Sequence, residues 1–350
     1  MLTPIANDRT ALVAIRHIGT AVSTLVVYCI LWLFFGNLKG QKIDPSNAPI
    51  FQDTAVIILA LGSIATAIFH FIIHPNTIKS DKIDTIEANE KTAFLQGNKN
   101  LGSENERISI FTWLKKPQFY QVGVLYLFTR LFVYVSQGYI PLYLDQTLNL
   151  DTTSLTIIPM VVFVGGIFSA SLTKYARKLL GRNLAFVVYC LIAGSACLWI
   201  NWGNATDDTF TGHEIYIIAI LIGIGGSGMR ILGLSVTSDL IGTNTNSSAF
   251  IYGSMSLLDK IGNGIAIMLI QESAPNQGIS PKVRSLYYKN VLFLVCGSFT
   301  IGGLFSALFL SAFHETKIEK SDQNDTETVE GDENKNDSSS KVHEHGKIDQ

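Results

Sequence analysis

Four ionisable side chains lie inside segments that are otherwise long and apolar: Arg130, Arg230, Asp259 and Lys260. A charge at the centre of a lipid bilayer costs about 2.5–3.5 kcal/mol on insertion scales. That cost is tolerated where the side chain faces a water-filled cavity, an opposite charge or a ligand. We therefore expect these four residues to lie inside a helical assembly, around a hydrated path that a polar solute could use.

Arg130 belongs to a polar stripe that continues with Tyr134 and Gln137. Residues spaced by four and then three lie on one face of a helix. In one interpretation this face lines a cavity and contacts a polar solute. In the other, Arg130 pairs with an acid on a neighbouring helix and only fixes the packing. We favour the cavity, because the surrounding run LYLFTRLFVYVSQGYIPLYL is otherwise apolar.

The densest group of polar residues is the run DLIGTNTNSSAFIYGSMSLLDKIGNGIAIMLIQ, residues 239–271. A polar turn leads directly into an apolar segment, and helical spacing places four polar side chains of that segment on one face. Lys260 follows Asp259 and is offset from it by about 100° around the helix. The two charges could neutralise each other through neighbouring helices, or Lys260 could change its pairing when an ion or solute binds. The candidates for the solute or ion path in this run are Asp239, Asn244, Asn246, Tyr252, Asp259 and Lys260.

Five glycines surround Arg230, at positions 223, 225, 226, 228 and 233. Glycine removes side-chain bulk, so these positions permit close helix approach or bending. Close packing alone explains them. With Arg230 among them, they also fit a moving helix that lines a solute path.

Eight apolar segments carry these residues, and each is about the length that crosses a bilayer. They run over residues 18–35, 54–73, 119–143, 152–173, 183–202, 215–234, 247–271 and 291–313. The chain of 350 residues is 47% hydrophobic and only 15% charged, against about 25% charged in soluble domains. These features predict an all-α polytopic membrane protein with about eight transmembrane helices. They also predict lipid as its surroundings.

Two polar stretches separate the apolar segments into groups. Residues 1–73 hold two spans, 74–118 form a central loop, 119–313 hold six spans, and 314–350 form an acidic tail that we expect to be disordered. Two helices, a long loop and six helices is the pattern of a six-plus-six transporter without its first four helices. We therefore expect residues 1–73 to end an N-terminal half and residues 119–313 to form the C-terminal half.

Lysine and arginine gather in the loop 74–118 and between residues 174 and 182. The positive-inside rule then places both loops and both chain ends in the cytosol. Asn204 begins an Asn-Ala-Thr sequon in a charge-poor loop on the other side, where it could be glycosylated.

Other classes of protein find no support in the sequence. No basic arm or zinc-ligand spacing suggests a nucleic-acid partner, and no nucleophile elbow, HExxH motif or phosphate-binding glycine loop suggests an enzyme. We expect neither a cofactor nor a metal. The four cysteines lie in apolar runs without a CxxC pair, so we expect no disulfide framework.

The run from Asp239 to Lys260 resembles the glycoside-pentoside-hexuronide:cation symporters, a branch of the major facilitator superfamily. That family has an acid at the end of its tenth helix, a polar turn, then a Tyr and a Lys in the eleventh, and Asp239, Tyr252 and Lys260 match these positions. The resemblance implies a major facilitator-type helical bundle and cation-coupled sugar uptake. It also implies that the cation is bound by acids of an N-terminal half, which the eight segments do not supply.

Two further resemblances concern the same superfamily. Residues 9–313 resemble an animal group associated with lysosomes and melanosomes and with cysteine import. TKYARKLLGRN, residues 173–183, resembles the superfamily's basic cytosolic-loop motif, with Lys174 and Arg182 as the expected gating residues, although the acid usual in that motif is missing.

Together these observations favour a secondary transporter of a small polar solute, such as a sugar or an amino acid like cysteine, coupled to a cation or a proton. The membrane would be the plasma membrane or the lysosomal membrane. The alternative is a shortened, non-transporting membrane protein that binds or regulates a full-length paralogue.

Overall fold

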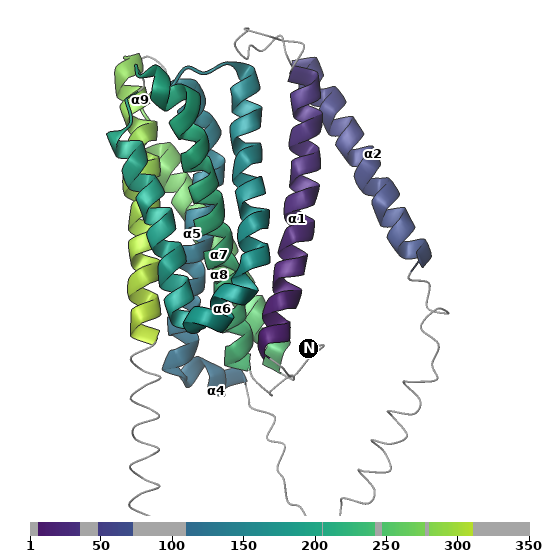
Figure 1. Ribbon diagram of the computed structural model, residues 1–350. Helices are drawn as coiled ribbons and strands as arrows, with labels where there is room; N and C mark the ends of the chain where they lie inside the picture. Colours follow the sequence, from purple (N-terminus) through teal and green to yellow (C-terminus); the bar gives the residue numbers. More distant parts are fainter. Residues whose placement is uncertain are drawn as a thin grey trace, which may run out of the picture.

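The computed structural model describes residues 6–35, 48–72, 110–204, 206–241, 247–276 and 280–310. Every regular element within these ranges is a helix, and the long helices run up and down in alternation (Figure 1). The predicted all-α membrane fold is thereby confirmed. Most of the loop 74–118 and the whole tail 314–350 lie outside the described residues.

The helices follow the expected order along the chain. They are α1 (Ala6–Phe35), α2 (Ala48–Ile72), α4 (Ile110–Lys115), α5 (Pro117–Gln146), α6 (Thr152–Trp202), α7 (Ile215–Ile241), α8 (Ser248–Glu272) and α9 (Pro281–Asn290). One π-helical turn, η3 (Phe210–Glu214), precedes α7, and another, η5 (Val291–Val295), continues α9 into a helix that reaches Leu310.

Six helices of the described part are long and apolar enough to cross a membrane. One of them, α6, has 51 residues, which is about 75 Å of helix against a hydrocarbon core of about 30 Å. Its backbone turns at Gly181, where φ is 78° and ψ is 172°. This left-handed conformation suits glycine, and it divides α6 into two antiparallel spans. Helix α8 is less apolar than these six but, with 25 residues, is long enough to cross, so the described helices supply eight membrane-length segments, the number that the sequence predicts.

Several predicted spans are shorter than the helices that contain them. The first helix begins at Ala6 rather than at residue 18, and the last begins at Pro281 rather than at 291. The loop expected between Thr173 and Asn183 is helical apart from the turn at Gly181. In each case polar residues lower the hydropathy of a segment that is nevertheless helical, because a helix can continue beyond the lipid.

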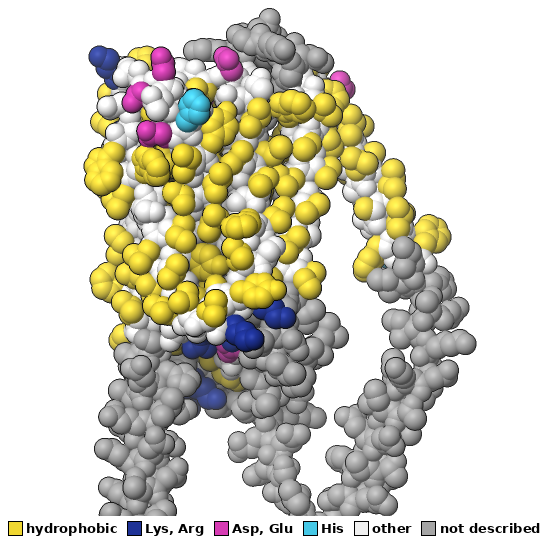
Figure 2. Space-filling view, in the orientation of Figure 1, with side chains coloured by type: hydrophobic (Ala, Val, Ile, Leu, Met, Phe, Trp, Pro, Cys, Tyr) yellow, Lys and Arg dark blue, Asp and Glu magenta, His cyan; other side chains and the backbone are white. Residues whose placement is uncertain are grey.

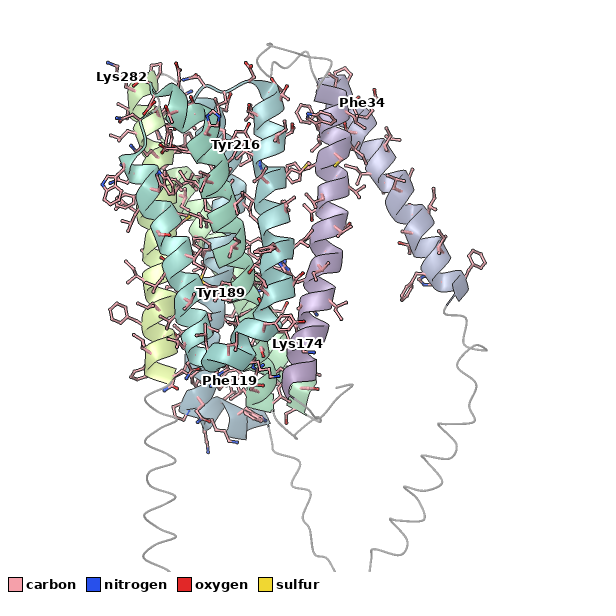
Figure 3. The ribbon with its side chains drawn as sticks, in the orientation of Figure 1. Phe34, Phe119, Lys174, Tyr189, Tyr216 and Lys282 are labelled. Carbon is pink, nitrogen blue, oxygen red and sulfur yellow. The ribbon has the colours of Figure 1, made fainter. Side chains whose placement is uncertain are left out.

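The outer surface has the polarity of a membrane protein. Figure 2 shows a broad band of hydrophobic side chains over the middle of the bundle, Lys and Arg mainly below it and Asp and Glu above it. Lys174 lies at the lower end of the bundle and Lys282 at the upper end (Figure 3). The chain is therefore an integral, multi-pass membrane protein, and the positive-inside rule predicts that the lower end is cytosolic.

The glycines of α7 bring three spans into close contact. A Cβ atom at Gly223 would lie 2.1 Å from the backbone oxygen of Val162 in the first half of α6, and one at Gly225 would lie 2.8 Å from the backbone nitrogen of Ala193 in its second half. Helix α7 is thus inserted between the two halves of α6. The glycines serve close packing, as one of the two interpretations of the sequence expects.

Gly223→Ala should lower the free energy of unfolding by about 1–3 kcal/mol, because backbone atoms of α6 must move to admit the methyl group. Thermal unfolding of the purified protein in detergent would measure the loss. Gly264→Ala in α8 is the matched control, since its Cβ would meet no atom within 4 Å. Equal stability of the two variants would contradict this account of the packing.

Helix α1 packs on α6 and α7, whereas α2 leans away from the bundle with α1 as its main neighbour (Figure 1). Tyr28 of α1 lies 5.6 Å from the ring of Phe163 in α6. Further down α1, His17 reaches α7. The N-terminal segment is therefore attached to the six-span unit through α1.

Candidate functional site

Arg130 lies on α5 and rests against a tyrosine of its own helix. Its Nη2 donates a hydrogen bond to the hydroxyl of Tyr126 at 2.8 Å, and its guanidinium carbon lies 4.8 Å from the centre of that ring. Tyr126 is one turn before Arg130, so helical geometry sets this contact. The arrangement holds the guanidinium in one place beside α5 but leaves its positive charge uncompensated.

Tyr134, one turn after Arg130, is where three helices meet. The guanidinium carbon of Arg230 in α7 lies 5.6 Å from the centre of the Tyr134 ring, and Nζ of Lys260 in α8 lies 6.0 Å from it. Cations are attracted to the face of an aromatic ring over such distances. The structure thus brings together four predicted residues from three separate spans: Arg130, Tyr134, Arg230 and Lys260. We call them the central cation cluster. Lys260 is exposed on the described helices, contrary to the expectation that it lies inside the assembly.

Asp259 is the acid next to this cluster. It is 6% exposed, and its Oδ1 accepts a hydrogen bond of 2.7 Å from Nδ2 of Asn263. The same amide group also donates to the backbone oxygen of Asp259 at 2.8 Å. Asp259 attracts Arg230 electrostatically, whereas Arg130 repels Arg230. Asp259 is therefore a carboxylate that interacts with Arg230, and Asn263 holds it in place.

Arg230 is incompletely paired. Its Nε is buried and has no hydrogen-bond partner among the residues that the structure describes. A buried donor without a partner is costly, and more so on a charged group. Together with the repulsion from Arg130, this makes the centre of the bundle a place where a negative group would be stabilised.

His17 of α1 also faces this region, and the sequence interpretation missed it. Its Nε2 lies 3.0 Å from Oγ of Ser227 in α7, and it lies within electrostatic reach of Arg130 and Arg230. The apolar run begins only at residue 18, so His17 seemed to precede the span. The polar pair Arg16-His17 immediately before that run was the available signal.

Tyr252 and Gln137, two further residues predicted to line the path, lie outside the side-chain contacts that define the central cation cluster. Tyr252 is partly buried and packs against the core cluster of Trp113 and Met255. Gln137 is half-buried on α5, three residues after Tyr134. Asn244 and Asn246 lie outside the described residues, so their expected roles stay predictions.

A second polar cluster lies at the lower end of the bundle, and we call it the cytosolic cluster because the positive-inside rule predicts that side. Oδ2 of Asp239 in α7 accepts from Nη2 of Arg177 at 3.0 Å and from Nη1 of Arg182 at 3.2 Å. Arg177 also donates to the hydroxyl of Ser235. The acid that pairs with the basic-loop motif therefore lies on α7 rather than within the motif. Arg177 is a second partner of this acid, which the sequence analysis did not name as a gating residue. Lys174, the other expected gating residue, is exposed.

Two other expected sites concern the surface and metals. Asn204 is exposed just after α6 ends at Trp202, and the preceding Gly203 accepts a hydrogen bond from Lys289 of α9 through its backbone oxygen. Within the described ranges no group of three His, Cys, Asp or Glu residues could hold a metal ion. The four cysteine thiols are free.

Comparison with known proteins agrees with this architecture. The chain is 31% identical over 281 residues to human major facilitator superfamily domain-containing protein 12, and 32% identical over 279 residues to the horse protein of that name. Each alignment covers 77% of this chain and 56% of the relative, so the chain spans about half the length of the curated relatives it matches. A family model described as MFS/sugar transport protein matches residues 1–320. The chain therefore belongs to the MFS/sugar transport protein family of the major facilitator superfamily.

Proposed function

We propose that this chain acts in secondary active transport of a small polar solute, by alternating access and coupled to a proton or another cation. The observation that carries the proposal is the central cation cluster. Arg130, Arg230 and Lys260 come from three spans. Arg230 and Lys260 lie over the Tyr134 ring, and Arg130 lies over Tyr126, two turns earlier on α5. Charges in that position are costly unless they serve a solute or ion path.

The candidate solutes are a sugar and an amino acid such as cysteine. Family membership favours a polar solute, and the family description names sugar transport. For coupling to a proton, His17 is a candidate because its ring lies beside the cluster, with Nε2 3.0 Å from Oγ of Ser227. We place the protein in the plasma membrane or the lysosomal membrane. No cofactor, nucleic acid or catalytic residue enters this proposal.

The proposed moving parts follow from the cytosolic cluster. Asp239 joins α7 to residues on both sides of the Gly181 turn in α6. These ion pairs would hold the cytosolic ends together in one state and separate in another. We propose that residues 1–73 end an N-terminal half, that 119–313 form the C-terminal half, and that Asn244 and Asn246 contribute to the polar turn between α7 and α8.

Lys260→Met tests the proposal. Removing the ammonium group should reduce solute uptake into proteoliposomes at least about tenfold, because one charge-assisted contact contributes about 1.5–3 kcal/mol. Uptake of radiolabelled sugars and cysteine would be measured under imposed proton and sodium gradients, at matched protein content. Lys282→Met, at the exposed upper end, is the control. Uptake by Lys260→Met equal to that of the unmodified chain would remove Lys260 from the path.

A second candidate is a non-transporting protein that binds or regulates a full-length paralogue. The observation that favours it is the open surface of α2, whose apolar span is only 6% buried. Co-purification with a full-length paralogue, combined with no uptake by the purified chain under any gradient, would select this candidate. Uptake by the chain alone would exclude it.

A further inference from the structure

The central cation cluster carries more positive charge than its surroundings balance. Arg230 and Lys260 lie over the Tyr134 ring, and Arg130 lies one turn earlier on α5 over the Tyr126 ring. Asp259 is the carboxylate that attracts Arg230. Resting on the function proposed above, we infer that Arg130 and Arg230 form a subsite for a carboxylate group of the transported solute. The solute is then an organic acid or carries an acidic group, rather than a neutral sugar.

The free hydrogen-bonding capacity lies on Arg230. Its Nε–H is buried and unpartnered within the part of the chain that the structure describes. A guanidinium presents its N–H groups in a planar fork that matches a carboxylate in two parallel hydrogen bonds. A carboxylate placed there would satisfy the buried donor and supply the missing negative charge in one step.

Asp259 cannot take over this role as it is placed. Its Oδ1 already accepts the amide of Asn263, and no ion pair joins Asp259 to Arg230 among the ion pairs of the described residues. Asp259 therefore attracts Arg230 without an ion pair, and the buried Nε–H of Arg230 has no hydrogen-bond partner among the described residues. One acid also cannot balance three cations.

Arg130 supplies the second half of the subsite. Arg130 lies one helical turn before Tyr134 on the same face of α5, and the guanidinium carbon of Arg230 lies 5.6 Å from the centre of the Tyr134 ring, so both arginines border the same region. An anion between two like charges replaces their repulsion by two attractions. The hydrogen bond from Nη2 to Tyr126 uses one of the five N–H donors of Arg130 and leaves others for the solute.

Matched pairs of solutes test the inference by binding alone. The purified full chain in lipid nanodiscs would be titrated with d-glucuronate against d-glucose, and with l-cysteine against cysteamine, by isothermal calorimetry at constant chloride. Each pair differs in a carboxylate. At least one carboxylate should bind about tenfold or more tighter than its partner, as expected for a charge-assisted hydrogen bond.

Variants assign the preference to the two arginines. Arg130→Gln and Arg230→Gln should each abolish it, whereas Lys282→Gln at the exposed upper end should retain it. Arg230→Lys retains the charge but lacks the fork, so it should keep a reduced preference. This milder variant decides the matter if a glutamine variant fails to fold.

The outcomes separate this inference from the proposed function. Uptake of neutral sugars without any preference for a carboxylate would overturn the subsite and leave transport standing; an acidic side chain elsewhere in the assembly would then balance the arginines. Equal binding of chloride alone would also overturn an organic carboxylate as the ligand. A carboxylate preference that depends on Arg230, in a chain that shows no uptake, would keep the subsite and reject transport.

Discussion

Asp259→Asn is expected to destabilise the protein by about 1.5–3 kcal/mol and to abolish uptake, although it barely changes the shape of the side chain. The asparagine oxygen can still accept the hydrogen bond from Asn263. What is lost is the negative charge beside Arg230 and Lys260. Breaking a buried charge arrangement leaves the remaining charges uncompensated, and this is more costly than removing all of them.

The reason can be tested by removing a positive charge at the same time. Asp259→Asn combined with Lys260→Met should recover most of the lost stability, while uptake stays absent. Unfolding in detergent, followed by circular dichroism, would give the stabilities. Asp208→Asn, an exposed acid at the upper end, is the matched control and should change neither quantity. If the single Asp259 variant is as stable as the double variant, charge balance does not govern this region.

The helices themselves could be predicted well where the amino-acid composition changes sharply at their ends. The expected span of residues 247–271 differs from α8 by one residue at each end. Polar residues precede it and Pro275 follows it, so the change in composition coincides with the ends of the helix. The turn in α6 was harder, because a single glycine reverses the chain while the basic residues around it remain helical.

The site could be predicted only in part, because periodicity describes one helix at a time. Spacing correctly places Arg130 and Tyr134 on one face of α5, but it does not say which other spans that face meets. The approach of Arg230 and Lys260 to Tyr134 depends on how α7 and α8 pack against α5. The pairing of Asp239 with Arg177 and Arg182 likewise depends on the fold of α6 around α7.

Asp239→Arg is expected to lower uptake at least about tenfold. The carboxylate accepts from Arg177 and Arg182 at 3.0 and 3.2 Å, and all three side chains are mostly buried. Each partly exposed pair contributes about 1 kcal/mol, and reversal adds repulsion among three cations. The total exceeds the 1.4 kcal/mol that corresponds to a factor of ten in an equilibrium constant, so the state with closed cytosolic ends should lose most of its population.

A charge exchange distinguishes pairing from a mere requirement for an acid at position 239. Arg182→Asp combined with Asp239→Arg restores an opposite pair between α6 and α7, so uptake should recover in part, whereas each single variant stays impaired. Lys178→Asp is the matched control for a charge reversal at the same end, because Lys178 is exposed. If the double variant is no better than either single variant, Asp239 acts through something other than its ion pairs. Because the exchange alters no residue of the central cation cluster, recovery would show that closure of the cytosolic end is a separate requirement from binding at the centre.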